Sequence, residues 1–353
     1  MKITEAIERV YHGGGLTCAD ARGVMTELLS GTVPDGEIIA FLTALGERGE
    51  TVDVLVGFAE VMRARAAELL PRAGLRIEDL HGAGPLLDTC GTGGDGLGTF
   101  NISTATALVA AAAGVRVAKH GNRSISSRCG SADVLEALGV RIELPPERIA
   151  ACLDAVGCVF LYAPQHHAAT RHVMNARRAM RTKTVFNLLG PLTNPLGATV
   201  QLTGVFDHAR TEIMAEALAR LGTRHAMVVA AWDGMDEVST TGTTRVSESF
   251  GGAVTTRQLA PEDFGMGRST AGSIEGGDAE INARILRHVL EGTPGYEPYR
   301  DAVFVNTSAA LVAAGRAQSF TEGVAVAAEA IKSGSALQTL IRLVEFTKHA
   351  TAN

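Results

Sequence analysis

The sequence predicts an α/β protein in which a small N-terminal helical domain precedes a larger domain with a mainly parallel sheet flanked by helices. Three observations predict this fold class. After Pro85, short β-like runs alternate with helical ones, as in βαβ units. Residues 1–70 show helical patterns and no β-like run. Glycine is abundant, at 40 of 353 residues, whereas aromatic residues make up 5%, which favours α/β over an all-β sandwich.

Composition excludes several classes of protein. A length of 353 residues, 46% of them hydrophobic, suffices for about two domains with sizeable cores. The net charge of −6 argues against nucleic acid or an anionic membrane as a partner. No apolar run reaches the roughly 20 residues of a membrane span, and the start does not resemble a signal peptide. Five cysteines without C-x-x-C spacing indicate a cytoplasmic protein.

Residues 1–72 form the predicted helical domain, which part of 165–195 is expected to join. Apolar spacing predicts helices near Ile3–Val10, from a Thr17 cap to Leu29, over Ile38–Leu45 and over Val52–Leu70. A linker is expected at Pro71–Pro85, which is rich in proline and glycine.

Residues 73–353 form the predicted α/β domain. The expected strands are Leu86–Thr89, Val115–Ala118, Arg141–Leu144, Cys158–Tyr162, Thr199–Val205 and His225–Ala231. Between them, helices are expected at Thr104–Ala113, Ser131–Leu138, Pro146–Val156, His167–Ala179 and Thr211–Leu221. Four more are expected at Ala279–Leu290, Asp301–Ala314, Thr321–Ser333 and Ala336–Thr347. Ligands of such sheets bind beyond the carboxyl ends of the strands.

A glycine-rich loop, Asp88–Thr99, follows the first predicted strand and precedes a helix. Its glycines formally match G-x-G-x-x-G, but the next strand ends at Lys119 rather than at the acidic residue that would hold a ribose hydroxyl. Small residues before a helix N-terminus still favour an anion, and Thr99, Ser103 and Thr104 offer hydroxyls. The alternative is a tight strand-to-helix turn.

A second polar loop, Lys119–Ser127, is expected directly after the strand Val115–Ala118. Lys119 and Arg123 supply positive charge, while Asn122 and the serines supply hydrogen bonds, a combination that suits a phosphorylated sugar. The alternative is a solvated loop before a capped helix. Two anion-binding loops at one sheet edge would suit a ligand with phosphates at both ends.

Asp236 and Glu237 follow the strand His225–Ala231. Mg²⁺ prefers oxygen ligands and often bridges carboxylates to phosphates, so the pair is a candidate magnesium site. A solvated acidic turn is the alternative.

Four motifs together resemble the anthranilate phosphoribosyltransferase family. They are GTGGDGLGTFNIST (Gly91–Thr104), KHGNRSISS with GSADVLEALGV (Lys119–Val140), FNLLGPLTNP (Phe186–Pro195) and GMDEVSTTG (Gly234–Gly242). The resemblance implies transfer of phosphoribose from phosphoribosyl pyrophosphate to the amine of anthranilate in tryptophan biosynthesis, with Mg²⁺ as cofactor. It also implies a homodimer formed through the helical domains.

The resemblance assigns three groups of site residues, and no acid or base among them. Phosphoribosyl pyrophosphate would contact Gly91, Gly94, Asp95, Thr99, Asn101, Ile102, Ser103, Thr104, Lys119, His120, Gly121, Asn122, Arg123, Ser124, Ile125, Ser126, Ser127 and Ser131. Anthranilate would contact Gly91, Asn122 and Arg177, with His120 and His167 near the same pocket. Mg²⁺ would be held by Ser103, Asp236 and Glu237.

The sequence departs from the family near the acceptor pocket. Ala168 replaces a frequent proline, Thr170 a larger residue, and Thr243 a usual proline, while Arg181-Thr182-Lys183 replaces a frequent Gly-Ile-Arg. These departures affect the expected anthranilate channel and leave the phosphoribosyl end intact. Two alternatives are a pyrimidine nucleoside phosphorylase-like enzyme, which would not need Asp236 and Glu237, and a non-catalytic nucleic-acid-binding relative, which would need a basic surface.

Overall fold

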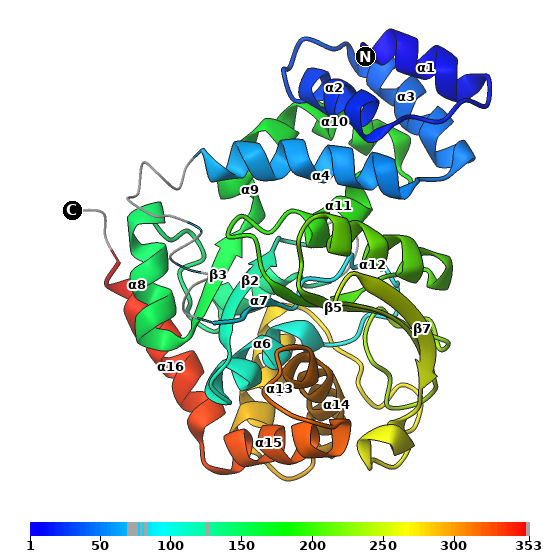
Figure 1. Cartoon of the computed structure of the whole chain (residues 1–353). Coiled ribbons are helices and arrows are strands. Elements are labelled where there is room, and N and C mark those ends of the chain that lie inside the picture. Colours follow the sequence, from blue (N-terminus) through cyan, green and yellow to red (C-terminus); the bar gives the residue numbers. More distant parts are fainter. Residues whose placement is uncertain (69–76, 78–79, 81–83, 125–127, 351–353) are drawn as a thin grey trace.

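The computed structural model describes residues 1–68, 77, 80, 84–124 and 128–350. Most of the expected linker Pro71–Pro85, and the loop residues Ile125, Ser126 and Ser127, therefore lie outside the described residues. The predicted fold class is confirmed: a group of helices lies over one face of a seven-stranded, mostly parallel sheet, and more helices cover the other face (Figure 1).

The N-terminal region consists of α1 (Ile3–Tyr11), α2 (Cys18–Leu28), α3 (Asp35–Arg48) and α4 (Val52–Ala67). Helix α2 begins at a capping box, in which Thr17 Oγ1 accepts from Asp20 N and Asp20 Oδ2 accepts from Thr17 N, both at 3.2 Å. Helix α4 begins where the Thr51 side chain accepts from Val54 N. The predicted Thr17 cap of α2 is therefore confirmed, whereas the Thr51 cap of α4 was not predicted.

The sheet has the strand order β3-β2-β1-β4-β5-β6-β7. Its first five strands are parallel: β1 (Leu86–Asp88), β2 (Arg116–Gly121), β3 (Cys158–Tyr162), β4 (Val200–Gly204) and β5 (His225–Ala231). Strands β6 (Thr244–Phe250) and β7 (Ala253–Leu259) extend it antiparallel.

Two hydrophobic cores lie on opposite faces of this sheet. Alternate residues of β5 divide between them: Met227 and Val229 point into one core, Ala226 and Val228 into the other. The first core is formed with α6 (Ile102–Ala112), α7 (Ser131–Ala137), α8 (Pro146–Val156), α13 (Ala279–Glu291), α14 (Glu297–Ala313), α15 (Phe320–Lys332) and α16 (Ser335–Lys348).

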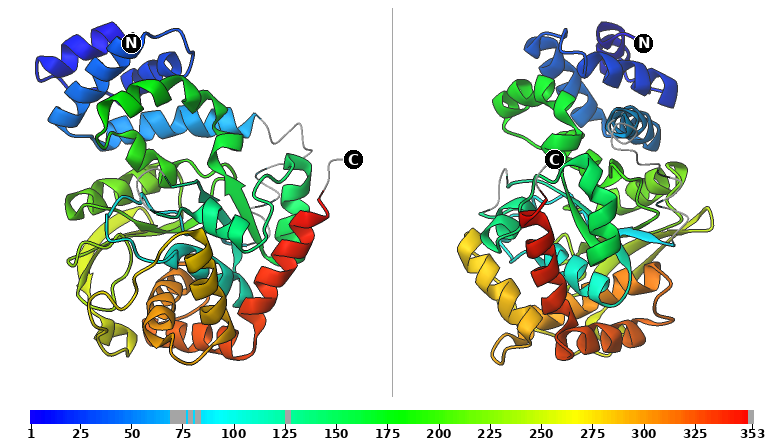
Figure 2. Two further views of the ribbon diagram at one scale, coloured as in Figure 1. Left: turned by 180° about the vertical axis from the view of Figure 1, so that it is seen from behind. Right: turned by 90° about the vertical axis from the view of Figure 1, so that its left-hand side faces the viewer.

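The second core joins the sheet to the N-terminal helices. It contains side chains from α1–α4 together with α10 (Arg171–Met180), α11 (Phe186–Leu192) and α12 (Thr211–Arg220). Helix α10 packs on α3, and α11 packs on α4 (Figures 1 and 2). The short helices α9 (Ala163–His166) and η2 (Ala168–Thr170) lead from β3 into α10.

Two sequence expectations were wrong, and one hairpin was missed. Arg141–Leu144 is not a strand: Ile142 and Leu144 are buried in the first core, but Arg141 N donates to Thr347 Oγ1 of α16 instead of to a neighbouring strand. The hairpin β6–β7 was not expected. Lys119, His120 and Gly121 lie within β2 rather than in the loop after it.

In the described ranges, none of the helices combines the length and the apolar character that crossing a membrane requires.

Candidate active site

The candidate site lies where the order of the parallel strands reverses. From β1 the chain proceeds to β2 and β3 on one side of the sheet, and later to β4 and β5 on the other. The loops after β1 and β4 meet at this point: Thr92 N donates to Gly204 O at 2.8 Å, and Phe206 N donates to Thr92 Oγ1 at 3.2 Å. Open α/β sheets bind their ligands at this crevice.

Three carboxylates gather below the glycine loop. Asp236 and Glu237 follow β5 as predicted, and Asp95 reaches them from the glycine loop. Burial, reinforced by the charge of Asp95, raises the pKa of Asp236 to about 7. Burial and the charge of Asp236 raise the pKa of Glu237 well above its ordinary value. The Asp95 Oδ2 atom is buried without a hydrogen-bond partner in the described part of the chain. Such a concentration of negative charge favours a bound cation.

Lys119 lies beside these carboxylates and is itself buried. Its Nζ donates to Ser103 Oγ and Thr89 Oγ1, both at 3.2 Å, and to Thr89 O at 3.3 Å. Its positive charge counteracts the rise in the pKa of Glu237. Strand β2 therefore places a cation, and helix α6 a hydroxyl, next to the expected magnesium ligands.

The start of helix α6 forms the floor of the glycine loop. Asn101 precedes the helix, and its side chain bonds Cys129 O at 3.4 Å and Asn282 Nδ2 at 2.9 Å. Thr99 pairs with Glu275 as an isolated bridge. Two predicted site residues point elsewhere: the Ile102 side chain is in the core, and Thr104 is buried, its Oγ1 without a described partner. Only the backbone of Ile102 is available to a ligand.

The second loop lies on helix α7. Ser131 Oγ donates to Asn122 O at 3.3 Å, and Gly121 allows this approach because a Cβ there would overlap Ser131 Oγ. Ser124 N donates to Asp133 Oδ2. The Arg123 guanidinium does not face the glycine loop; it is paired with acidic residues of α7.

A pocket of about 770 Å³ opens beside the glycine loop, and Arg177 lines it. The partly buried Arg177 guanidinium stacks 5.1 Å from the centre of the Phe186 ring, and burial lowers its pKa. No acidic side chain pairs with it among the residues described. The other charged residues of the lining are Arg128, Arg178, Arg181 and Lys183, which are basic, and Glu275. The pocket is therefore suited to an organic anion.

His120 and His167 lie together behind the glycine loop, with ring centres 5.2 Å apart. His120 Nδ1 bonds Gly190 O at 3.0 Å, and His167 Nε2 bonds Thr193 O at 2.9 Å. Burial lowers the pKa of His167 to about 4 and that of His120 well below its ordinary value. Both rings are thus neutral at physiological pH.

Several residues that shape the site were not expected from the sequence. Lys183 Nζ donates to Gly94 O at 2.7 Å and lies 3.7 Å from the centre of the Phe206 ring, so it holds the glycine loop. Gly204 is needed because a Cβ there would overlap Asp236 O. Arg181 has φ 53° and is the one non-glycine residue with positive φ in the described ranges. The sequence showed that Arg181 departs from the family's frequent Gly-Ile-Arg, but it did not predict the left-handed conformation of Arg181.

Comparison with known proteins agrees with this geometry. Residues 83–337 match the glycosyl transferase family, a/b domain, and residues 4–66 match the helical bundle domain of the same family. An anthranilate phosphoribosyltransferase of Thioalkalivibrio sulfidiphilus is 49% identical, covering 98% of this chain and 99% of the relative. The chain belongs to the anthranilate phosphoribosyltransferase family.

Other anthranilate phosphoribosyltransferases are similar over nearly their whole length. One from Methanocorpusculum labreanum is 46% identical and covers 97% of each chain. The crystal structure of the Thermus thermophilus protein has a TM-score of 0.85 at 41% identity, covering 97% of this chain and 99% of the other. The Saccharomyces cerevisiae anthranilate phosphoribosyltransferase, solved in complex with PRPP (phosphoribosyl pyrophosphate) and Mg, has a TM-score of 0.84 at 26% identity and covers 98% of each chain.

Proposed function

We propose that this chain transfers the phosphoribosyl group of phosphoribosyl pyrophosphate to the amine of anthranilate, giving N-(5-phosphoribosyl)anthranilate and pyrophosphate. One observation carries the proposal. Asp95, Asp236 and Glu237 converge beneath a glycine loop that also borders the basic pocket of Arg177. A cation site for pyrophosphate and an anion site for an aromatic acid therefore share one loop.

The carboxylate cluster fits Mg²⁺. Burial and mutual repulsion raise the pKa values of Asp236 and Glu237, and Lys119 offsets only part of the rise at Glu237, so a bound cation would stabilise the charged carboxylates. Ser103, Asp236 and Glu237 would hold the ion, which supplies electrostatic stabilisation of the departing pyrophosphate when bound. The Saccharomyces cerevisiae relative solved with PRPP and Mg supports this assignment.

The chain's own residues would position the phosphoribosyl donor. The glycine loop brings backbone N–H groups toward phosphate oxygens, and Lys119 adds a fixed positive charge close to Glu237. The proposed contacts are Gly91, Gly94, Asp95, Thr99, Asn101, Ile102, Ser103, Thr104, Lys119, His120, Gly121, Asn122, Arg123, Ser124, Ile125, Ser126, Ser127 and Ser131. Ile102, Thr104 and Arg123 would contribute backbone groups only, because their side chains point elsewhere.

Arg177, with Gly91 and Asn122, would hold anthranilate. The guanidinium has a planar fork suited to a carboxylate, and stacking on Phe186 fixes its plane. Holding the amine near C1 of the ribose supplies the orientation that the reaction needs. No acid or base is assigned, because the arylamine can lose its proton after attack.

Loss of anthranilate fluorescence tests the proposed function. Fluorescence should fall only when phosphoribosyl pyrophosphate and Mg²⁺ are both present, and it should fall less after EDTA treatment. Phosphorolysis of pyrimidine nucleosides by the same preparation would favour the nucleoside phosphorylase alternative. No loss of fluorescence under any condition would defeat the proposal.

We further propose a homodimer formed through the helical domains, on the strength of the family resemblance. Sedimentation of the purified chain should give twice the monomer mass. A monomer across micromolar concentrations would contradict it.

A further inference from the structure

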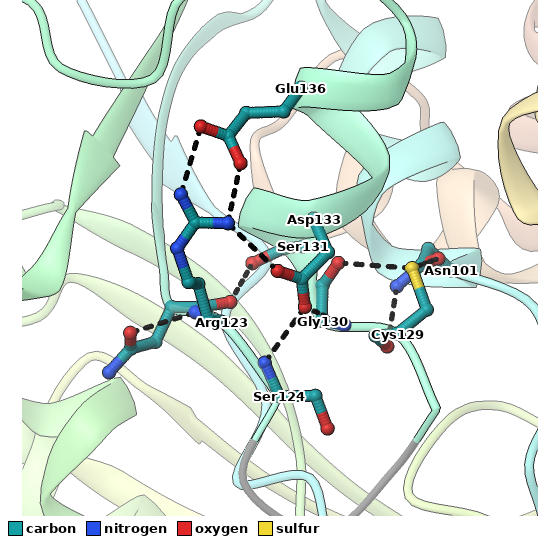
Figure 3. Close-up of polar contacts among 9 residues, drawn as sticks. Asn101, Arg123, Ser124, Cys129, Gly130, Ser131, Asp133 and Glu136 are labelled. Atoms are coloured by element: carbon teal, nitrogen blue, oxygen red, sulfur yellow. Dashed lines mark hydrogen bonds and ion pairs between the residues drawn. The ribbon is translucent and has the colours of Figure 1, made fainter. Parts of the chain in front are cut away.

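Helix α7 closes the base of the second loop through a single carboxylate. Asp133 Oδ2 accepts from Ser124 N at 3.0 Å and from Gly130 N at 2.8 Å, so one oxygen joins both ends of the segment 124–130 (Figure 3). Gly130 permits this closure because a Cβ there would overlap Ser124 N. Ser124 and Gly130 are thereby fixed to the first turn of the helix.

Arg123 reinforces the same closure from the outside. Its Nη1 donates to Glu136 Oε2 at 2.5 Å and to Asp133 Oδ1 at 3.1 Å, and its Nη2 donates to Glu136 Oε1 at 2.9 Å. Figure 3 shows the guanidinium directed at helix α7, with both Glu136 oxygens engaged. Asp133 and Glu136 are three residues apart, so they share one face of the helix.

This arrangement leaves little room for a direct phosphate contact by the Arg123 side chain. A phosphate reaching the same guanidinium edge would meet two carboxylates of its own sign. Asn122 O accepts hydrogen bonds from Ser131 Oγ and from Ala132 N. These two bonds fix Asn122 at the start of the segment that precedes α7.

We infer that Arg123 is a positioning residue, which clamps residues Asn122–Ser124 of the second loop to helix α7 through Glu136 and Asp133 so that these residues are held in place for phosphoribosyl pyrophosphate. The inference rests on the proposed function and replaces the expectation that the Arg123 side chain binds the phosphate itself. Glu136, which no motif assigned to the site, becomes part of its support.

The clamp is expected to affect binding more than stability. The Arg123 and Glu136 side chains are 47% and 41% exposed, and ion pairs that exposed contribute little to the free energy of unfolding. Glu136→Gln should therefore fold normally while residues Asn122–Ser124 lose part of their support. Residues that are held less firmly must be ordered by the ligand, and this weakens the ligand's apparent affinity.

Steady-state kinetics of Arg123→Gln, Glu136→Gln and the double variant test the inference. Each single variant should raise the KM for phosphoribosyl pyrophosphate by about 2- to 5-fold, the range that loss of an exposed ion pair can supply, with little change in kcat or the KM for anthranilate. The double variant should be no worse than the more affected single variant, because both changes break one clamp. Glu147→Gln, an exposed carboxylate of α8, is the control and should behave as the parent.

Direct phosphate binding by Arg123 gives a different result. Arg123→Gln alone would then raise this KM, whereas Glu136→Gln would leave it unchanged or lower it by releasing the guanidinium. That pattern would overturn the inference, and Glu136→Gln alone decides it if Arg123→Gln does not fold. An inactive parent chain would instead contradict the proposed function, so the two failures are distinguishable.

Discussion

Arg177 is the residue whose role depends most on a single charge. Arg177→Ala should raise the anthranilate KM by about 10- to 100-fold, because a charge-assisted hydrogen bond is lost. Arg177→Lys should recover little, since an ammonium cannot replace a planar fork stacked on Phe186. The neighbouring exposed Arg178, changed to Ala, is the matched control and should have a much smaller effect. Equal KM values in all three variants would mean that Arg177 does not contact the acceptor.

Asp236 should make the ligand-free chain lose stability as pH rises. Its pKa is raised to about 7 from 3.8, so between these values the folded chain binds a proton that the unfolded chain has released. Asp236 by itself should therefore lower the free energy of unfolding by at most about 1.4 kcal/mol per pH unit from pH 4 to 7, and its contribution should be constant above pH 7.

Urea unfolding at pH 5, 6 and 7 measures this dependence. Subtracting the Asp236→Asn curve from the parent curve removes the opposite contribution of the buried histidines, whose pKa values are lowered. Saturating Mg²⁺ should reduce the difference, because the ion would displace the proton. A parent curve with the same slope as Asp236→Asn would show that the carboxylate is not protonated in this range.

Arg181 combines backbone strain with a charge at the pocket. A left-handed conformation costs a non-glycine residue about 1–2 kcal/mol, and asparagine adopts it more readily than arginine. Arg181→Asn should therefore raise the free energy of unfolding by about 0.5–1 kcal/mol and raise the anthranilate KM a few-fold. The KM effect should shrink in 0.5 M KCl, if the charge acts at long range. Arg181→Lys, which keeps both charge and strain, should leave both measurements near the parent values.

At the scale of elements, the end of β4 packs so closely against the loop after β5 that no side chain fits at Gly204. Gly204→Ala would place a Cβ in overlap with Asp236 O, so the loop with Asp236 and Glu237 must move. We expect a loss of about 1–3 kcal/mol in the free energy of unfolding and a larger relative loss of Mg²⁺-dependent turnover. Gly267→Ala, in the same domain with open space around its Cβ position, should change neither quantity.

The elements that were predicted correctly are those with local signals. The five parallel strands and the capped helices depend on apolar runs and on residues such as Thr17. The segment Arg141–Leu144 was predicted as a strand because its apolar residues alternate. These alternate residues are buried, but the segment pairs with no described strand. The β6–β7 hairpin did carry a signal, since Gly251-Gly252 joins two alternating runs. Contacts such as Lys183 with Gly94 could not be predicted, because 89 residues separate the partners and only the packed fold joins them.

At the scale of the whole molecule, one core crosses from the N-terminal helices to the sheet. Arg63 of α4 is part of this junction: its Nε donates to Leu192 O at 2.6 Å and its Nη1 to Leu221 O at 2.9 Å. Burial lowers the pKa of Arg63 to about 10. The chain should therefore unfold in one cooperative step, despite matching two family domains.

Arg63→Ala should divide the single unfolding transition into two. It leaves two carbonyl groups without their donors, which should cost about 2–4 kcal/mol at the junction. Trp232 is the single tryptophan and lies in the α/β part, so its fluorescence reports that part alone, whereas far-UV circular dichroism reports both. The two urea transitions should coincide in the parent chain and diverge in the variant. Coincident transitions in the variant would show that the junction does not couple the two parts.

The β6–β7 hairpin has a consequence for how copies of this chain behave when crowded. A parallel sheet ending at β5 would present an apolar strand with free backbone groups, an edge on which another chain can pair. The hairpin covers this edge with β6 and leaves β7 as the outer strand. The exposed residues of β7 include Thr255, Thr256, Arg257 and Gln258. These polar and charged side chains disfavour edge-to-edge pairing between molecules. The terminal strands, which contribute nothing to the chemistry, thus protect the catalytic sheet from aggregation.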